Sequence, residues 1–534
     1  MGKHNSFIEN TKEVDERLEA LKQLYPEIFS DGKINLDAFK DVTGTSDLPD
    51  GQDKTPGYYG LYWPGKRAAK QLARKEAEGT LEPVVGDGVN EDTTHNIYIE
   101  GENLEVLRIL KQSYKGRVKM IYIDPPYNTG KDFIYPDDYK MPVEEYLKMT
   151  GQADESGKRL SSNLKSNGAF HTNWLNMMYP RLQIARELLT EDGVIFISID
   201  DNEQSNLRLT CDDIFGEENF IAYVIHKNNS MKNQSKYMGI TTEYVLIYSK
   251  NMEYLKEKEP EWRIRKKGTS DVKKMFEKLK EEGNSLETIR DEILNMYSRP
   301  KYSHLGRWNK VDDGGVFTDK DLSRANGYKD FTITNPNTGK DCLIPSRGWG
   351  KSKAELLELQ EKGMIWYGDD STPPREKSYL SDEADSVCDN YIYVDTSVDK
   401  KMLETMFGSE VFDYPKPLEM INTFLQLAAG NEAIILDFFS GSATTAHAVV
   451  QYNAELKKKC KFIMVQLPQE CEKNSEAYKA GYKNICEIGK ERIRRAGTQI
   501  LKQVQNTKNT TQMFSMGGGY RWKPLRLWRI RDTA

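Results

Sequence analysis

The segment VKMIYIDPPYNTG, residues 118–130, decides the fold class of this chain. Residues 118–123 are almost continuously apolar, which predicts a short strand buried on both faces of a parallel sheet. Asp124 follows at the carboxyl end of that strand, where open α/β sheets bind their ligands. Pro125 and Pro126 stiffen the turn because their rings fix φ, and the Pro125 carbonyl is free to accept a hydrogen bond.

Asp124 and the Pro125 carbonyl together form a pair of acceptors suited to an aromatic amine. Such an amine is a poor nucleophile because its lone pair is delocalised into the ring. Two acceptors on its N–H bonds favour a more tetrahedral nitrogen and stabilise the positive charge that develops on it during methyl transfer. Tyr127 adds a flat face on which an unstacked base can lie. The alternative is a strand ending in a proline-rich turn with an incidental Asp and Tyr.

Strand and helix patterns alternate on both sides of this segment. Short apolar runs at 96–100, 194–200, 433–437 and 461–467 are separated by helical patterns, which predicts a parallel sheet flanked by helices. The pattern stops near residue 252 and resumes at 416. We therefore expect one sheet built from two halves of the chain, with an inserted α+β domain between them. The expected borders are 1–90 for a helical and connecting segment, 91–252 and 406–505 for the two halves, 253–405 for the insertion and 506–534 for a tail.

A second motif, DFFSGSATTAHAV at 437–449, follows the predicted strand 433–437 and opens a helix. A turn of small residues at this place lets backbone approach a ligand at a helix N-terminus. Gly441 is the residue expected to need a positive φ or a close ligand. A tight strand-to-helix turn without a ligand is the alternative for this motif taken alone.

Four stretches in this order carry a resemblance to a known family: DPPYNTGKDFIY at 124–135, HTNWLNMMYPRL at 171–182, FDYPKPLEMI at 412–421 and LDFFSGSATTAHAV at 436–449. They resemble the β-class amino-methyltransferases, and specifically the modification subunits of type III restriction–modification systems. The resemblance implies a Rossmann-like fold that uses S-adenosylmethionine to methylate adenine N6 in duplex DNA by base flipping. It also implies a homodimer and a partner restriction subunit with helicase and nuclease activity.

The resemblance also assigns residues. Asp124, Pro125, Pro126 and Tyr127 are the implied catalytic motif. The implied cofactor residues are Phe439, Gly441 and Ala443 in the loop, Asp437 toward the cofactor amino group, Lys416 toward the methionine end, Gln466 toward the ribose and Glu102 toward the adenine. Three features depart from the family pattern: Ala443 replaces a glycine, Glu102 replaces the usual Asp, and the final stretch at 517–534 finds no match. His171 and Trp174 are expected to be structural, and Asp132 and Phe133 to line either the base pocket or a surface loop.

The insertion is rich in basic residues interleaved with aromatic ones, a composition that suits phosphate contacts and stacking. The candidate DNA-binding residues are Arg263, Arg265, Lys266, Lys267, Arg307, Lys310, Arg347, Lys351 and Lys353. A solvated surface charge is the alternative for any one of them.

Net charge, the length of apolar runs and cysteine spacing limit the classes of function that this chain can have. The net charge of −6 argues against a protein that coats nucleic acid by charge alone, so DNA binding is expected to be local. The chain has no apolar run long enough for a membrane span and no visible secretory signal, which predicts a cytoplasmic protein. The cysteines lack metal-ligand spacing, and no metal is expected. Cytosine-N4 methylation, for which Ser usually stands at position 124, and a catalytically silent DNA-binding module remain the rival functions.

Overall fold

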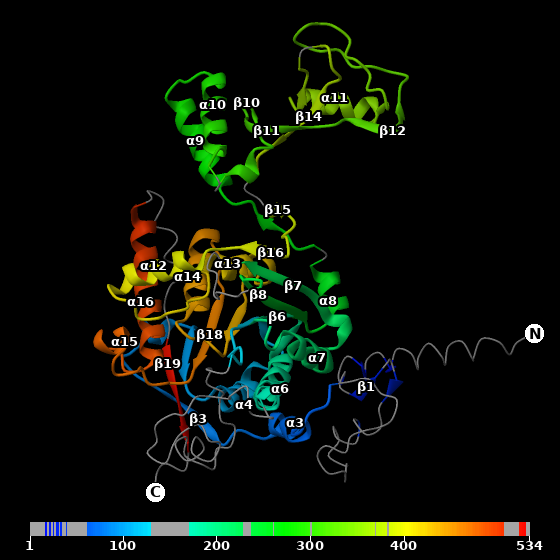
Figure 1. Ribbon diagram of the computed structural model, residues 1–534. Helices are drawn as coiled ribbons and strands as arrows, with labels where there is room; N and C mark the ends of the chain where they lie inside the picture. The colour runs from blue at the N-terminus through cyan, green and yellow to red at the C-terminus, as the bar shows by residue number, and fades with distance from the viewer. Residues whose placement is uncertain are drawn as a thin grey trace, which may run out of the picture. The chain divides into compact units, whose positions relative to one another are not determined.

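The computed structural model describes residues 61–129, 170–227, 237–259, 261–299, 302–368, 370–381, 384–506 and 523–529, with scattered positions between 17 and 39. Asp132 and Phe133 therefore lie outside the described residues. The chain divides into two compact units, Met1–Trp262 with Asp389–Ala534 and Arg263–Cys388 (Figure 1). None of the helices in the described ranges is long and apolar enough to cross a membrane.

A ten-stranded sheet forms the centre of the first unit, in the order β16-β7-β8-β6-β5-β17-β18-β4-β19-β3. Its strands are β3 (Gly79–Pro83), β4 (Ile97–Glu100), β5 (Val118–Ile123), β6 (Leu189–Ile199), β7 (Phe220–Lys227), β8 (Thr242–Ser249), β16 (Tyr391–Tyr393), β17 (Ile434–Asp437), β18 (Lys461–Gln466) and β19 (Lys523–Arg529). The five strands from β6 to β4 run parallel, and β8 and β3 run antiparallel to their neighbours. The sheet is thus mainly parallel, as the apolar runs predict.

The two halves of the chain meet between β5 and β17. These strands are parallel neighbours, with Met120 opposite Ile435 and Ile121 opposite Leu436. The prediction of one sheet assembled from two halves is confirmed. Because parallel neighbours end at the same edge of the sheet, the loops that follow β5 and β17 emerge side by side.

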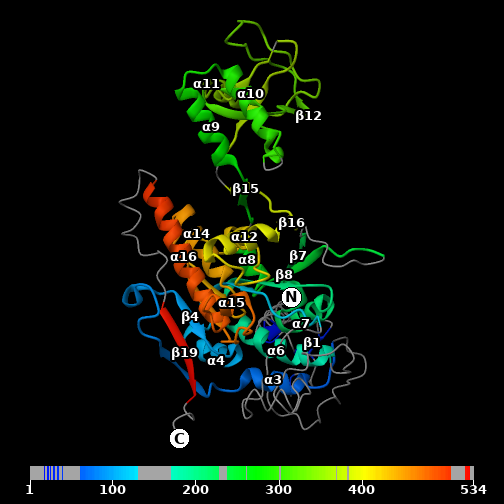
Figure 2. The same cartoon turned by 60° about the vertical axis from the view of Figure 1, so that its left-hand side comes forward.

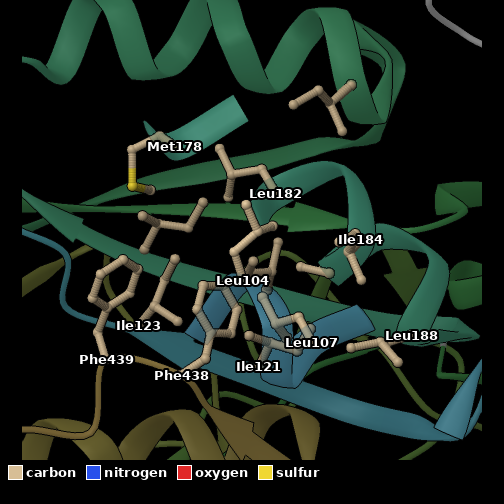
Figure 3. Close-up of a cluster of buried hydrophobic side chains, with 14 of the residues drawn as sticks. Leu104, Leu107, Ile121, Ile123, Met178, Leu182, Ile184, Leu188, Phe438 and Phe439 are labelled. Atoms are coloured by element: carbon tan, nitrogen blue, oxygen red, sulfur yellow. The ribbon is translucent and has the colours of Figure 1, made fainter. Parts of the chain in front are cut away.

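Two groups of helices cover opposite faces of the sheet, as Figures 1 and 2 show. The first group is α3 (Lys66–Arg74), α4 (Asn103–Tyr114), α6 (Phe170–Leu188) and α7 (Gln204–Phe215); the second is α13 (Leu418–Ala428), α14 (Thr444–Leu456) and α16 (Ile485–Asn506). Smaller helices are α8 (Met252–Lys258), α12 (Thr396–Phe407) and α15 (Glu476–Lys479). Beneath the first group lies a continuous apolar cluster from α4, β5 and α6, which also takes in Phe438 and Phe439 (Figure 3).

The last described strand, β19, pairs with two strands from the first hundred residues near one edge of the sheet. β19 lies parallel to β4 and antiparallel to β3, with Leu525 opposite both Ile99 and Pro83. Residues 523–529 are therefore part of the central sheet, which corrects the expectation of a separate tail. Residues 66–83 likewise belong to this unit, not to a connecting segment. The alternation of Leu525, Arg526 and Leu527 is the strand signal that the sequence already contained.

The second unit, residues 263–388, has α+β architecture. It holds α9 (Thr269–Glu281), α10 (Leu286–Tyr297) and α11 (Lys353–Glu361), with a four-stranded antiparallel sheet in the order β10-β11-β14-β13. The strands are β10 (Lys310–Asp312), β11 (Gly315–Lys320), β13 (Ile365–Trp366) and β14 (Arg375–Tyr379), beside β12 (Ser323–Tyr328) and the pair β9 (Ile264–Arg265) and β15 (Ala384–Ser386). The insertion is shorter than expected at both ends, because α8 contacts β6 and β16 pairs with β7.

Candidate active site

The catalytic loop, residues 124–128, leaves the carboxyl end of β5 and is held from outside by α6 and by the turn before α7. The Trp174 indole, fully buried in α6, donates to the Pro126 carbonyl at 2.7 Å. The Asn128 side-chain amide donates to Glu203 Oε1 at 2.5 Å and to the Phe170 carbonyl at 3.2 Å. Asn128 adopts a left-handed φ of 59°, which Asn tolerates better than most residues.

His171 and Trp174, at the start of α6, make the kind of structural contacts that the sequence predicts for them. Trp174 fixes a backbone carbonyl of the loop, and His171 Nδ1 lies 2.6 Å from Glu203 Oε1. The Glu203 carboxylate is fully buried, and Asn128, His171 and Asn206 all contact its oxygens. The loop is therefore fixed through its backbone and through Asn128, while the Asp124 and Tyr127 side chains point to a different set of partners.

Those partners form a charged cluster around Lys416, which lies in the segment before α13. Lys416 Nζ is 2.8 Å from Glu243 Oε2 and 3.2 Å from Asp124 Oδ1, and it donates to the Tyr127 hydroxyl. It also lies 4.6 Å from the centroid of the Tyr127 ring, within cation–π range. The Tyr127 hydroxyl donates to Glu243 Oε2 at 3.3 Å. This group, Asp124, Tyr127, Glu243 and Lys416, is called the amine cluster below.

Burial is the largest single influence on the pKa values of Asp124, Tyr127 and Lys416. It raises the pKa of Asp124, and Glu243 raises it further, while the ammonium of Lys416 opposes both. Burial works against the charge of Lys416, but Asp124 and Glu243 outweigh it and raise the Lys416 pKa. The pKa of Tyr127 is raised by burial and by the same two carboxylates, so its phenol stays protonated. The cluster thus contains one firmly held cation between two carboxylates.

The cofactor loop, residues 437–443, leaves the carboxyl end of β17 beside the catalytic loop. Gly441 has a φ of +51°, as predicted for this position, and its N–H donates to Gln466 Oε1 at 2.7 Å. A Cβ built on Gly441 would meet only Phe412 at ordinary contact distance and its own loop's backbone at 4.0 Å. Among the described residues, the backbone of this turn is therefore open to a ligand, which fits a cofactor resting on it.

Asp437, predicted to face the cofactor, uses its oxygens to join the cofactor loop to the first turn of α14. Oδ1 accepts from the Phe439 N–H at 3.0 Å and Oδ2 accepts from the Thr445 hydroxyl at 2.6 Å. Burial raises its pKa to about 7, against the opposing effect of these two hydrogen bonds. Phe439 points into the apolar cluster of Figure 3 with 6% of its surface exposed. Both residues hold the loop in shape, and a direct cofactor contact for either stays a prediction.

Ala443 occupies the position of the missing glycine with a φ of +61°, the left-handed region that glycine favours. It is fully buried and begins α14. Arg492 of α16, also fully buried, donates to Ser442 Oγ at 2.8 Å and Thr444 Oγ1 at 2.7 Å on either side of it. Arg492 therefore ties down the strained turn, a role that no pattern in GKERIRRAG indicates.

Glu102 caps α4. Its carboxylate accepts from the Leu104 and Glu105 N–H groups at 2.9 and 2.8 Å and pairs with the buried Arg181 at 2.7 Å. Asn103 links this cap to the cofactor loop by donating to the Phe438 carbonyl at 2.7 Å. The structure therefore places Glu102 beside the cofactor loop as a helix cap, and its contact with the cofactor adenine stays a prediction.

The basic residues of the insertion separate into two kinds. Lys266 Nζ and the Arg307 guanidinium lie 5.1 and 5.5 Å from the Trp308 ring centroid, so these two cations share one aromatic ring. Arg265, Lys267, Arg307, Arg347 and Lys353 are exposed. Lys310 instead binds Asp319, and Lys351 Nζ lies 3.6 Å from Glu376, so nearby carboxylates balance these two charges. Arg263 is half-buried. DNA contact by any of the nine stays a prediction.

Besides Arg492, three further important residues were missed from the sequence. Glu243 opens the apolar strand EYVLIYS, where an isolated acid is itself a signal; Glu203 sits in the acidic turn DDNE; and Asn128 directly follows the DPPY tetrapeptide. Each lies far along the chain from at least one of its partners, so only the folded chain pairs them.

The fold and these two adjacent loops define an S-adenosylmethionine-dependent amino-methyltransferase. A family described as DNA methylase matches residues 118–496 of this chain. The chain is 34% identical to the Mod subunit of the type III restriction–modification enzyme EcoP15I of Escherichia coli, over 94% of this chain and 78% of that protein. It is 32% identical to the StyLTI Mod subunit of Salmonella typhimurium, over 90% and 71% of the two chains. The chain belongs to the DNA methylase family and, within it, to the modification subunits of type III restriction–modification enzymes.

Two further comparisons were found. The EcoPI Mod subunit of Escherichia phage P1 is 32% identical over 95% of this chain and 78% of its own. A solved structure of a putative DNA modification methylase from Thermus thermophilus, complexed with S-adenosyl-L-methionine, is 12% identical with a TM-score of 0.29, over 76% of this chain and 94% of its own.

Proposed function

We propose that this methyltransferase modifies the N6 amine of adenine in duplex DNA, after the base has turned out of the helix into the site beside Asp124. The observation that carries the proposal is the position of Asp124. It stands at the carboxyl end of β5, whose parallel neighbour β17 leads into the cofactor loop, and it is grouped with the Tyr127 ring. An acceptor, an aromatic face and a cofactor turn are thus adjacent.

The proposed reaction is a direct transfer. S-adenosylmethionine, when bound on the 437–443 turn, supplies an electrophilic methyl group on a sulfonium. Asp124 and the Pro125 carbonyl accept hydrogen bonds from the two N6–H groups, and the base stacks on the Tyr127 ring. The bound cofactor would give its methyl group to the N6 lone pair, with the electron pair of the broken S–C bond remaining on sulfur. The surplus proton of the methylated amine then leaves along its hydrogen bond to Asp124.

Trp174 affects the geometry of the two proposed acceptors because its indole donates a hydrogen bond to the Pro126 carbonyl. With the neighbouring carbonyl fixed by a buried indole, the orientation of the peptide units on either side of Pro126 is set before a base arrives. Preorganised acceptors of this kind cost no rearrangement at the moment of reaction, which is why they lower a barrier effectively.

Cytosine-N4 methylation is the second candidate, since the same amine chemistry would serve it. Asp at position 124, where the cytosine enzymes usually carry Ser, favours adenine. Transfer of tritium from labelled cofactor to plasmid DNA, followed by hydrolysis and separation of the bases, decides between them. We expect the label in N6-methyladenine; label in N4-methylcytosine would overturn the base assignment.

Asp124→Ala tests the mechanism. We expect methyl transfer to fall by about 10²–10³-fold or more, the usual loss when one preorganised partner of the reacting group is removed. Asp192→Ala is the matched control, because its carboxylate binds Lys119 in the first half of β5, away from the site. Transfer retained by Asp124→Ala would exclude this role, and a wild-type chain that binds DNA without labelling it would support the silent module.

The DNA-binding part of the proposal rests on the insertion. The exposed Arg307 lies with Lys266 beside the Trp308 ring, and this group offers cations and an aromatic ring to the phosphate backbone. Further exposed cations are Arg265, Lys267, Arg347 and Lys353. We further propose a cytoplasmic homodimer that acts with a helicase-nuclease restriction subunit, on the basis of its relatives, which are Mod subunits of type III enzymes. Light scattering of the purified chain tests the dimer.

A further inference from the structure

One oxygen of the amine cluster is in an unusual state. Asp124 Oδ1 is buried, and no donor among the described residues makes a well-directed hydrogen bond to it. Lys416 Nζ lies 3.2 Å away as an ion-pair partner, and its ammonium lowers the pKa of Asp124. Leaving a buried acceptor without a donor is costly, so native structures rarely retain one without a functional reason.

The donors of Lys416 are directed elsewhere. Its ammonium donates to Glu243 Oε2 at 2.8 Å and to the Tyr127 hydroxyl, and the Lys416 and Glu243 side chains are 13% and 12% exposed. Glu243 belongs to β8 and Lys416 to the segment before α13, so the pair joins two parts of the chain 173 residues apart. Glu243 therefore fixes the direction in which the ammonium faces.

We propose that Lys416, held by Glu243, is a positioning residue that balances the charge of Asp124 while leaving Oδ1 available to the amine of the target base. The inference rests on the proposed function, because it assigns the open oxygen to the substrate amine. Lys416 was predicted from the family resemblance to close over the methionine end of the cofactor. The distances above give it a second task, on the catalytic carboxylate.

The physical argument is a division of labour between two carboxylates. A buried carboxylate without a counter-charge takes up a proton, and a protonated Asp124 has one acceptor fewer. A lysine bonded directly to Oδ1 would solve this problem but would occupy the oxygen that the amine needs. Anchoring the lysine on Glu243 keeps its charge beside Asp124 while its hydrogen bonds go to Glu243 and Tyr127.

The charged and titratable groups around Asp124 come from several elements. Lys416 stands against it, Tyr127 follows it in the loop, Tyr122 precedes it on β5, and Glu243 and Asp437 approach from β8 and β17. Lys416 is the cation among these five groups, so its removal should raise the Asp124 pKa. Removal of the Glu243 charge should lower the Asp124 pKa, because Glu243 raises it.

The experiment is the pH dependence of kcat for methyl transfer to plasmid DNA at saturating cofactor, whose acidic limb reports the catalytic carboxylate in the enzyme–substrate complex. Lys416→Met should move that limb to higher pH by about 1–3 units, the usual effect of one adjacent cation on a carboxylate. Lys416→Arg should keep it near the wild-type position. Glu243→Gln should lower kcat at every pH and move the limb to equal or lower pH, because the freed ammonium turns toward Oδ1.

Lys119→Met is the control, since Lys119 also lies between two carboxylates, Asp192 and Glu259, but away from the cluster. Its limb should stay in place. Circular dichroism and calorimetric titration with S-adenosylmethionine establish that each variant folds and binds cofactor. An unmoved limb in Lys416→Met, or a folded variant inactive at every pH, would overturn the proposal; should Lys416→Met not fold, a Glu243→Gln limb that rises would do so. A wild-type chain that methylates no DNA amine would instead overturn the proposed function.

Discussion

The catalytic and cofactor loops leave neighbouring parallel strands at the same sheet edge, yet their own residues contribute to their stability in different ways. The catalytic loop is stiffened by two prolines and held by outside groups, the Trp174 indole and the Asn128–Glu203 pair. The cofactor loop relies on left-handed turns at Gly441 and Ala443, on the Asp437 carboxylate, which joins the Phe439 N–H to Thr445 of α14, and on Arg492 of α16.

This difference follows from what each loop must present. The catalytic loop presents side chains, so Asp124 and Tyr127 are spared from structural duty and the restraint comes from elsewhere. The cofactor loop presents backbone, so its own acidic side chain is used to fix the turn, and close approach requires small residues there. Three variants test this contrast, taken from the largest expected effect to the smallest.

Trp174→Phe should break the outside restraint on the catalytic loop. The Pro126 carbonyl loses its donor, which costs about 1–3 kcal/mol of stability for a buried polar group left unpaired. We expect kcat to fall roughly tenfold or more through misplaced acceptors, with cofactor affinity unchanged. Trp63→Phe is the matched control, because the Trp63 indole also donates a hydrogen bond, to Asn176 Oδ1 at 2.7 Å. That bond does not involve the catalytic loop. Equal kcat losses in both variants would contradict the specific role of Trp174.

His447 sits one turn into α14 behind the cofactor loop, and burial, with Arg492 nearby, lowers its pKa to about 3 from an ordinary 6.5. Because the unfolded chain binds this proton first, stability should be lost as pH falls from about 6.5 toward 3. The loss approaches 1.4 kcal/mol per pH unit, or about 2 kcal/mol at pH 5.

His447→Gln removes that proton and keeps an acceptor for Arg492 Nε, which lies 3.4 Å from His447 Nδ1. Denaturant unfolding at pH 8 and pH 5 gives the difference between variant and wild type, in which the opposing contribution of Asp437 cancels. The variant should gain on the wild type as the pH falls; a difference independent of pH would refute the assignment.

Ala443→Gly should relieve the left-handed backbone at the start of α14. An L-residue in this region costs about 1–2 kcal/mol, and the greater freedom of glycine in the unfolded chain returns part of it. We expect a net gain of at most about 1 kcal/mol, with cofactor binding equal or tighter by calorimetry. Ala446→Gly, at a buried position within α14, should instead lose about 0.5–1 kcal/mol. Losses of the same sign in both would show that the 443 turn is not strained.

Local sequence predicted the centre of the fold well and its margins poorly. β5, β17 and β18 were predicted because each is a buried apolar run followed by a turn motif. β3 was missed as part of the sheet because it is a short edge strand, and β19 because its partners β3 and β4 lie far from it along the chain. The insertion borders were misplaced because α8 and β16 carry no signal of the sheet that they join.

The sequence by itself determined the chemistry of each loop, since Asp124 with two prolines and Gly441 in a small-residue turn carry their conformations in their covalent structure. It also determined the class of protein, through four motifs in a fixed order. Only the tertiary structure decided which groups share one space: Glu243 with Lys416, Trp174 with the Pro126 carbonyl, and Arg492 with the Ala443 turn. Such pairs depend on the packing of distant elements, and charge balance in a buried site is a property of the whole neighbourhood rather than of any one segment.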